Sequence, residues 1–201
     1  MKLVAVSLRV DKWANRDERR DTLAKGWAPI MQKCDAVSFA VPNEPGNVVP
    51  LMDRTNPDAI LLSGGNDLVP YGGDAPERDA AETAMIEWAV ANGRAIIGVC
   101  RGMEMVVHAM GGTLKRVEGH IGNHVIRHMD GRETIVNSWH RWAVDRLPTG
   151  FCATAFGEDA VLEACRDPGR RVECIMWHPE RCSPVDSSDL DLIRRALWSN
   201  A

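Results

Sequence analysis

Short apolar runs alternate along the chain with segments in which apolar side chains recur every three to four residues. The apolar runs predict buried strands, which we expect in the first half at residues 3–10, 36–41, 59–63 and 95–100. The helical spacing predicts helices at about 77–92 and 101–110, and an earlier one that begins near Arg16, with an apolar face formed by Leu23, Trp27, Ile30, Met31 and Cys34. Residues 43–56 show no clear period and are expected to form a loop with at most a short helix. This order predicts βα units and therefore an α/β fold, a single-domain three-layer α/β/α sandwich with a mostly parallel central sheet.

After Gly111-Gly112 the pattern changes to short strands, which predict a small antiparallel region. These strands are expected at residues 113–117, 124–129, 132–137, 152–156, 161–165 and 172–177. Asp130-Gly131 predicts a type I′ hairpin turn, because that turn needs positive φ at both central residues. Ser188 and Asp191 form a capping-box pattern, which predicts a last helix with its apolar face at Leu190, Ile193 and Leu197.

Composition and charge narrow the class of protein. The chain has 201 residues, of which 45% are hydrophobic and 26% charged, and its formal net charge is −4, values typical of a globular protein. One domain is expected over residues 1–201. The sequence has no dense Lys/Arg stripe and no apolar stretch of about 18 residues, so neither a nucleic acid nor a membrane is expected as a partner. The apolar start is too short for a secretory signal, which predicts a cytoplasmic protein.

The strongest chemical motif is Gly98-Val99-Cys100-Arg101-Gly102, at the junction of a predicted strand and a predicted helix. This G-x-nucleophile-x-G form in a strand–turn–helix context is typical of a nucleophile elbow. The start of the helix would lower the pKa of the thiol and favour the thiolate. The alternative is a buried structural cysteine, and the two glycines with the strand–helix context favour the nucleophile.

A thiol nucleophile needs a base, and His178-Pro179-Glu180 at the end of an apolar strand offers one. Residues i and i+2 of an extended chain point to the same side, so the Glu180 carboxylate is expected to hold one ring nitrogen of His178. Alone, this tripeptide could equally mark a strand-terminal turn. Its occurrence downstream of the elbow is what favours a catalytic Cys-His-Glu set.

The segments GVCRGME, SGGND, VNSWH and MWHPE together resemble the class I glutamine amidotransferase superfamily, in its γ-glutamyl hydrolase branch (peptidase C26), from about Leu3 to Arg181. The resemblance implies a flavodoxin-like fold and a cysteine-dependent hydrolase that cleaves a γ-glutamyl amide through a γ-glutamyl thioester and releases L-glutamate. It assigns Cys100 as the nucleophile, His178 as the base and then the acid, and Glu180 as the group that orients His178. No cofactor is expected.

The resemblance also implies a substrate-binding set. Oxyanion donors would come from the Gly64-Gly65 loop and the N–H of Arg101, which suits glycines because a backbone without Cβ can approach a substrate closely. Position 104 carries Glu where many relatives carry Gln, and Glu104 is expected to contact the amino-acid end of the substrate. The family's segment that lines the glutamyl pocket corresponds to Asn137, Ser138 and His140.

A narrower resemblance concerns the leaving group. The stretch Arg9-Val10-Asp11, the charged run at residues 16–21, Trp27 and the form SGGND resemble the γ-glutamyl-CDP-amidate hydrolases, which release glutamate and cytidine diphosphoramidate during modification of bacterial capsules. A diphosphate leaving group needs cations near the mouth of the site. The residues proposed for this pocket are Arg9, Arg19, His120 and His124, with Arg16, Arg20 and Arg101 as further candidates. Taken alone, the charged run is equally typical of a solvated helix face.

His120, His124 and His128 lie four residues apart, which on a helix would be a metal-ligand spacing. Gly119 and Gly122 argue against a helix, and the spacing fits a strand leading to the Asp130-Gly131 turn. A solvated or substrate-facing strand is therefore favoured, and no metal site is expected.

The amidotransferase domain is expected to occupy nearly the whole chain, which leaves no room for a fused synthetase and favours hydrolysis of a small-molecule γ-glutamyl substrate. Three alternatives remain open: a glutaminase subunit that delivers ammonia to a separate synthetase partner, a hydrolase of γ-glutamyl amines or peptides, and a non-catalytic binding relative. The last is disfavoured because all three triad residues are present. A homo-oligomer is compatible with the sequence.

Overall fold

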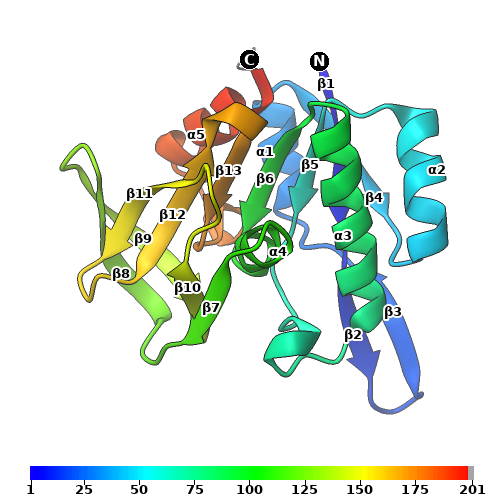
Figure 1. Ribbon diagram of the computed structural model, residues 1–201, viewed down its shortest axis with the longest axis horizontal. Coiled ribbons are helices and arrows are strands. Elements are labelled where there is room, and N and C mark those ends of the chain that lie inside the picture. The colour runs from blue at the N-terminus through cyan, green and yellow to red at the C-terminus, as the bar shows by residue number, and fades with distance from the viewer. Residues whose placement is uncertain (199–201) are drawn as a thin grey trace.

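A twisted sheet runs through the middle of the molecule and carries helices on its faces (Figure 1). The computed structural model describes residues 1–198, so the last three positions of the predicted domain 1–201 lie outside the described residues. The strands are β1 (Lys2–Ser7), β2 (Arg9–Trp13), β3 (Glu18–Thr22), β4 (Ala36–Val41), β5 (Ala59–Leu62), β6 (Ala95–Val99), β7 (Thr113–Arg116), β8 (Ile121–His128), β9 (Glu133–Trp139), β10 (Trp142–Arg146), β11 (Cys152–Gly157), β12 (Leu162–Asp167) and β13 (Val172–Ile175). The helices are α1 (Trp27–Lys33), α2 (Pro45–Thr55), α3 (Pro76–Ala91), α4 (Arg101–Ala109) and α5 (Ser187–Trp198), and 3₁₀ turns lie at η1 (Val69–Tyr71), η2 (Pro168–Arg170) and η3 (Pro179–Arg181).

The main sheet has a parallel half and an antiparallel half. Within residues 1–198 its strand order is β4-β1-β5-β6-β13-β12-β11-β8-β9. Pairing is parallel from β4 to β13 and antiparallel from β13 to β9. The apolar strands β5 and β6 are buried along their whole length, as expected for central strands covered on both faces. The predicted α/β fold with its central parallel strands and antiparallel region is confirmed.

Helices complete the two outer layers. On one face α2 packs against α3, and Trp88 of α3 donates its indole N–H to Asp53 of α2 at 2.7 Å. On the other face α1 and α5 meet, and Trp198 of α5 donates to the carbonyl of Cys34 at 3.1 Å. The carboxyl ends of β5, β6 and β13 lie at the same edge of the sheet, where ligands bind in folds of this type.

The predicted helix beginning at Arg16 is wrong for its first part. A β2–β3 hairpin occupies this region, and α1 begins only at Trp27. Charged side chains pair along the hairpin, and the guanidinium of Arg20 lies 4.1 Å from the centroid of the Trp13 ring. The amide of Asn66 bonds the N–H and the carbonyl of Val10 at 2.9 Å each, so a distant loop holds β2 in an extended conformation. The single strand expected at residues 3–10 is two strands, because β1 ends at Ser7 and the next residues pair with β3 as β2.

The ends of several other elements also differ from the prediction. Residues 45–55 form helix α2, and Asn56 closes it in the left-handed conformation.

The turn at residues 130–131 also differs from the prediction. It is not type I′, because Gly131 has φ +85° while Asp130 does not have positive φ. Helix α5 begins at Ser187 with Asp186 accepting from the Ser188 N–H, so Asp186 is its capping residue in place of Ser188. Strand β13 ends at Ile175, two residues before the predicted end, and β10 was not predicted at all.

Among residues 1–198, none of the helices is both long enough and apolar enough to cross a membrane.

Candidate active site

Cys100 lies in the sharp turn between β6 and α4. Its backbone has φ 52° and ψ −112°, a strained conformation for a residue with a Cβ. Tight packing explains the glycines on either side: a Cβ on Gly102 would fall 2.0 Å from the carbonyl oxygen of Leu62, and one on Gly98 would fall 2.9 Å from the carbonyl oxygen of Gly102. The backbone therefore has the geometry of a nucleophile elbow.

The charge state of the Cys100 thiol differs from the expectation. Burial raises its pKa, Glu104 raises it further when ionised, and the backbone N–H of Arg101 lowers it. Burial thus raises the thiol pKa by more than the N-terminus of α4 lowers it, and the site without substrate holds a neutral thiol. A base that takes the proton during attack is required.

His178 is held in the orientation that a base needs. Its Nδ1–H donates to Glu180 Oε1 at 2.8 Å, and its Nε2 is buried without a hydrogen-bond partner among residues 1–198. A Cβ on Gly64 would lie 2.7 Å from His178 Cε1 and 3.6 Å from Cys100 Cβ, so the imidazole and the thiol approach the same stretch of backbone. His178 and Glu180 meet across the 3₁₀ turn η3, in place of the extended chain that was predicted.

Asn137 positions His178 and does not line the substrate pocket as expected. Its Oδ1 accepts from the backbone N–H of His178 at 2.8 Å, and its Nδ2 donates to the carbonyl of the same residue at 3.0 Å. Ser138 is buried and likewise lies outside the pocket lining. Trp139, the last residue of β9, lines the pocket, and the sequence analysis did not single it out.

A cavity of about 360 Å³ opens beside Cys100. Its walls come from the SGGND loop, the start of α4 and the segments that flank the β8–β9 hairpin: Gly65, Asn66, Asp67, Cys100, Arg101, Glu104, Ile121, Trp139, His140 and Arg141. Glu104 and His140 are therefore placed where the sequence analysis expected them. Burial raises the pKa of Glu104 to about 8, opposed by Arg101 and reinforced by Asp67, so its carboxyl group is mainly protonated at neutral pH.

The SGGND loop is held by a residue that the sequence analysis missed. Arg78 is fully buried and donates to the carbonyls of Ser63 at 2.7 Å and Gly65 at 3.0 Å. Its Nε also donates to Glu82 at 2.9 Å. Gly65 has φ +95°, so this loop depends on a conformation that glycine adopts easily. The i, i+4 spacing of Arg78 and Glu82 was the available signal, but such pairs are far more often exposed.

The side chain of Arg101 extends the same buried ion network. It pairs with Asp79 and Glu82 of α3 and is 2% exposed. The network therefore ties the SGGND loop to the first turn of α4. This leaves only the backbone N–H of Arg101 to serve the site.

The four residues expected around the leaving group are not gathered in one place. Arg9 abuts the SGGND loop, because a Cβ on Gly65 would lie 3.2 Å from three atoms of its side chain. Arg19 donates to Glu77 at 2.9 Å on the outer side of α3. His120 and His124 turn toward Glu163 of β12. Of the four, Arg9 is thus the one that abuts the SGGND loop, and none of the four lines the cavity beside Cys100.

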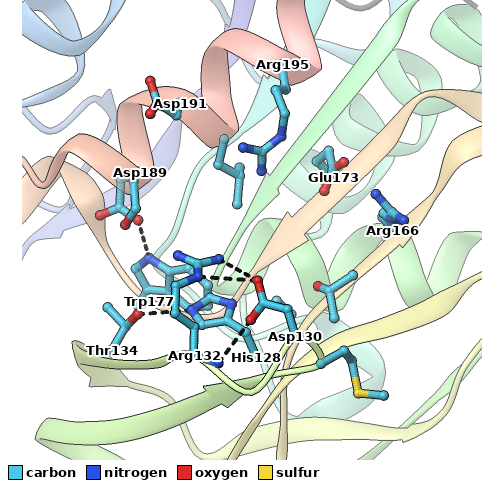
Figure 2. A pocket seen from close by; sticks show the side chains of 15 residues that line it. His128, Asp130, Arg132, Thr134, Arg166, Glu173, Trp177, Asp189, Asp191 and Arg195 are labelled. Atoms are coloured by element: carbon cyan, nitrogen blue, oxygen red, sulfur yellow. Dashed lines mark hydrogen bonds and ion pairs between the residues drawn. The ribbon is translucent and has the colours of Figure 1, made fainter.

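A second cavity, of about 460 Å³, lies between the β8–β9 hairpin and α5 (Figure 2). Charged side chains surround it, and Trp177 donates to Asp189 at 2.8 Å at its edge. Burial raises the pKa of Asp189 to about 6. Cys100 is absent from its lining and present in that of the smaller cavity, so the smaller cavity is the candidate active site.

The comparisons with known proteins agree with this fold. Residues 31–192 match the family described as glutamine amidotransferase class-I, and the chain belongs to this family. Over 125 residues it is 32% identical to γ-glutamyl-CDP-amidate hydrolase of Campylobacter jejuni, which covers 61% of this chain and 62% of that protein. Over 136 residues it is 32% identical to the glutamine-hydrolysing GMP synthase of Thermotoga maritima, covering 64% of this chain and 25% of the synthase.

A solved structure has the same fold at low identity. The crystal structure of a glutamine amidotransferase from Thermotoga maritima superposes with a TM-score of 0.72 at 16% identity, covering 99% of this chain and all of that one. The chain spans less than two thirds of the length of the curated relatives named above.

Proposed function

We propose that the chain hydrolyses a γ-glutamyl amide through a thioester on Cys100, and that its substrate is γ-glutamyl-CDP-amidate. The observation that carries the chemistry is the pairing of His178 Nδ1 with Glu180 at 2.8 Å. It leaves His178 Nε2 buried beside the strained turn at Cys100, with no hydrogen-bond partner in the described part of the chain. These are the three roles of a triad: nucleophile, base and orienting acid.

The proposed sequence of steps starts from the neutral thiol. As Sγ attacks the γ-carbonyl carbon, its proton moves to His178 Nε2, and Glu180 stabilises the imidazolium that forms. Backbone N–H groups of Arg101 and of the Gly64-Gly65 loop receive the negative charge on the carbonyl oxygen. His178 then protonates the leaving nitrogen, and the C–N bond breaks. In the second half of the reaction a water molecule loses a proton to His178 and attacks the thioester carbon. The C–S bond breaks, the proton returns from His178 to sulfur, and glutamate and the free thiol result.

The choice of substrate rests on the Campylobacter relative, whose name gives γ-glutamyl-CDP-amidate as its substrate, and on the protonated Glu104 in the cavity. A protonated carboxyl presents one donor and one acceptor, as the Gln of many relatives does. Arg9 beside the SGGND loop is a cation available to a diphosphate at the mouth of the site.

The test is glutamate release by the purified chain from γ-glutamyl-CDP-amidate, with glutamine and a γ-glutamyl amine as competing substrates. Cys100→Ala is expected to lower kcat at least about a thousandfold, because it removes the only atom that forms the thioester. Cys152→Ala is the matched control, since Cys152 is exposed and lies far along the chain on β11, and it should retain full activity. Equal rates for wild type and Cys100→Ala would refute the mechanism, and a preference for glutamine would refute the substrate.

The similarity to a GMP synthase supports a second candidate, a glutaminase that delivers ammonia to a separate synthetase. A subunit of that kind would release glutamate from glutamine slowly until its partner is added. Turnover of γ-glutamyl-CDP-amidate by the chain alone, at a rate that no added synthetase changes, would exclude this candidate.

A further inference from the structure

Three histidines converge on one buried carboxylate outside the triad. His120, His124 and His140 place a ring nitrogen at 3.2, 3.4 and 3.4 Å from the same oxygen, Oε1 of Glu163. Glu163 is fully buried, and His120 and His140 are 6% and 7% exposed. We call these four residues the histidine–glutamate cluster.

None of these close approaches is a hydrogen bond. His120 Nδ1, His124 Nε2, His140 Nε2 and both carboxylate oxygens of Glu163 are buried without a hydrogen-bond partner among residues 1–198. A buried carboxylate without a partner is strongly destabilising. A positive charge placed between these ligand atoms would therefore stabilise the cluster.

The hydrogen bonds on the far side of two rings fix where their protons are. His140 Nδ1 lies 2.9 Å from the carbonyl oxygen of Trp142, which can only accept, so Nδ1 carries the proton. His120 Nε2 lies 2.9 Å from Asp159 Oδ2 and donates to that carboxylate. In the neutral rings the remaining nitrogens, His120 Nδ1 and His140 Nε2, then point lone pairs at Glu163. Two lone pairs facing a carboxylate is the arrangement that a metal cation stabilises.

The outer hydrogen bonds are also those of a metal site. Histidine ligands typically donate their second ring N–H to a carboxylate or a backbone carbonyl, which fixes the tautomer and the direction of the ring. Asp159 and the Trp142 carbonyl fill these two roles. The ligand atoms of His120, His124 and Glu163 all lie within 4.8 Å of one another, a separation that one ion can span.

We propose that the histidine–glutamate cluster binds a divalent first-row transition-metal ion, with Zn²⁺ the first ion to test. Nitrogen and carboxylate donors without sulfur suit such ions. His120, His124 and Glu163 offer three ligands close enough for one ion, and His140 Nε2, 3.4 Å from Glu163 Oε1, borders the same position. This departs from the expectation of a solvated or substrate-facing strand without a metal. Sequence spacing could relate His120 to His124, but Glu163 comes from β12 and only the fold brings it in.

The placement of the cluster indicates what the ion does. His120 precedes β8, His124 lies on β8, His140 follows β9, and Glu163 lies on β12. The ion therefore fastens the open end of the β8–β9 hairpin to the main sheet, next to Ile121, Trp139 and His140 in the wall of the active-site cavity.

The test is Zn²⁺ binding to chelator-treated Cys100→Ala protein, a background that removes the triad thiol as a competing ligand. One equivalent is expected to bind. Adding Glu163→Gln is expected to weaken binding at least about a hundredfold, and Asp159→Asn about tenfold, because the latter acts through the orientation of His120. His128→Ala is the matched control: His128 lies on the same strand but bonds Thr134 at 3.1 Å, and its loss should change the dissociation constant less than threefold.

A cluster variant could lose zinc binding because it fails to fold. Two further measurements therefore use Cys100→Ala protein with the cluster intact. Its Co²⁺ complex should show ligand-field bands without a thiolate charge-transfer band. Anomalous diffraction at the zinc edge should place the ion between Glu163 and His120. Absence of Zn²⁺ binding would overturn the proposal and would show that protons alone stabilise the cluster. An ion located elsewhere would also overturn it, as would a Glu163→Gln variant that binds Zn²⁺ as tightly as its parent.

Discussion

Glu104 illustrates how burial alone changes the chemistry of a single residue. Its carboxyl lines the cavity beside Cys100, and burial raises its pKa from 4.5 to about 8. At neutral pH the acid is mainly protonated, so it does not repel the α-carboxylate of a glutamyl group as an ionised carboxylate would. The replacement of Gln by Glu at this position is thus a smaller chemical change than the sequence indicates.

A stability measurement tests this protonation state. Between pH 4.5 and 8 the folded chain holds a proton on Glu104 that the unfolded chain has lost, so this residue makes the free energy of unfolding fall as pH rises through that range. Glu104→Gln removes the dependence. Relative to wild type, the variant should be about equally stable near pH 4 and more stable near pH 9, by an amount on the order of a few kcal/mol.

Urea unfolding of both proteins at the two pH values measures this difference. A gap between the two proteins that does not change with pH would show that Glu104 is ionised in the folded chain.

The sequence singled out the three candidate triad residues because each motif is local. Cys100 is framed by glycines two residues away on each side, and His178 lies two residues from Glu180, so the signals sit within a few positions. The partners that position them come from distant segments: Arg78 holds the SGGND loop and Asn137 holds the backbone of His178. Spacing along the chain carries no information about such contacts, and this is why the sequence analysis missed or misplaced them.

At the scale of elements, the buried strands were predictable and the hairpin was not. Strands β5 and β6 are apolar throughout, which is a strong signal for burial on both faces. Strand β3 consists of Glu, Arg, Arg, Asp and Thr, and a charged run of this kind is also typical of an exposed helix. Its conformation is set by pairing with β2, and β2 is in turn held by Asn66. Local preference could not indicate that a distant amide decides the fold of this segment.

The contact between β5 and α4 predicts the effect of one added methyl group. Gly102→Ala would place a Cβ 2.0 Å from the carbonyl oxygen of Leu62, so the strand or the helix must move. We expect a loss of about 2 kcal/mol or more in the free energy of unfolding, together with a lower kcat, because α4 carries the Arg101 N–H.

Gly46→Ala is the matched control for this substitution. Gly46 also lies in a helix, α2, but an added Cβ would meet no atom within 4 Å. It should be neutral or stabilising by about 0.5–1 kcal/mol. Chemical denaturation and steady-state kinetics on both variants check the pair, and equal losses would show that the β5–α4 contact is not tight.

At the scale of the whole molecule, a buried set of charges joins α3, α4 and the SGGND loop. Arg78 and Glu82 are fully buried, Arg101 is nearly so, and burial lowers the pKa of Arg78 to about 9. A network of this kind fixes relative positions more than it adds stability, because desolvation offsets much of the attraction. The network therefore holds α3, the turn at Cys100 and the SGGND loop in one arrangement relative to one another.

Arg78→Met should accordingly damage both stability and catalysis. It leaves the carbonyls of Ser63 and Gly65 and one oxygen of Glu82 without their donor, and we expect a loss of about 3 kcal/mol in the free energy of unfolding with a reduced kcat. Arg127→Met is the control, because the Arg127–Glu133 pair is exposed and should contribute less than about 1 kcal/mol. If the two variants lose the same stability and keep the same kcat, the network does not position the loop.

The strained backbone at Cys100 has a further consequence for how this residue is kept over evolution. A left-handed φ of 52° disfavours any side chain with a Cβ by on the order of 1 kcal/mol, and glycine would relieve it. Relief of this strain favours glycine, whereas packing of the buried thiol favours cysteine, so selection for stability alone does not require a cysteine here. In a related protein that no longer used this sulfur atom, we would therefore expect other residues, glycine among them, at this position.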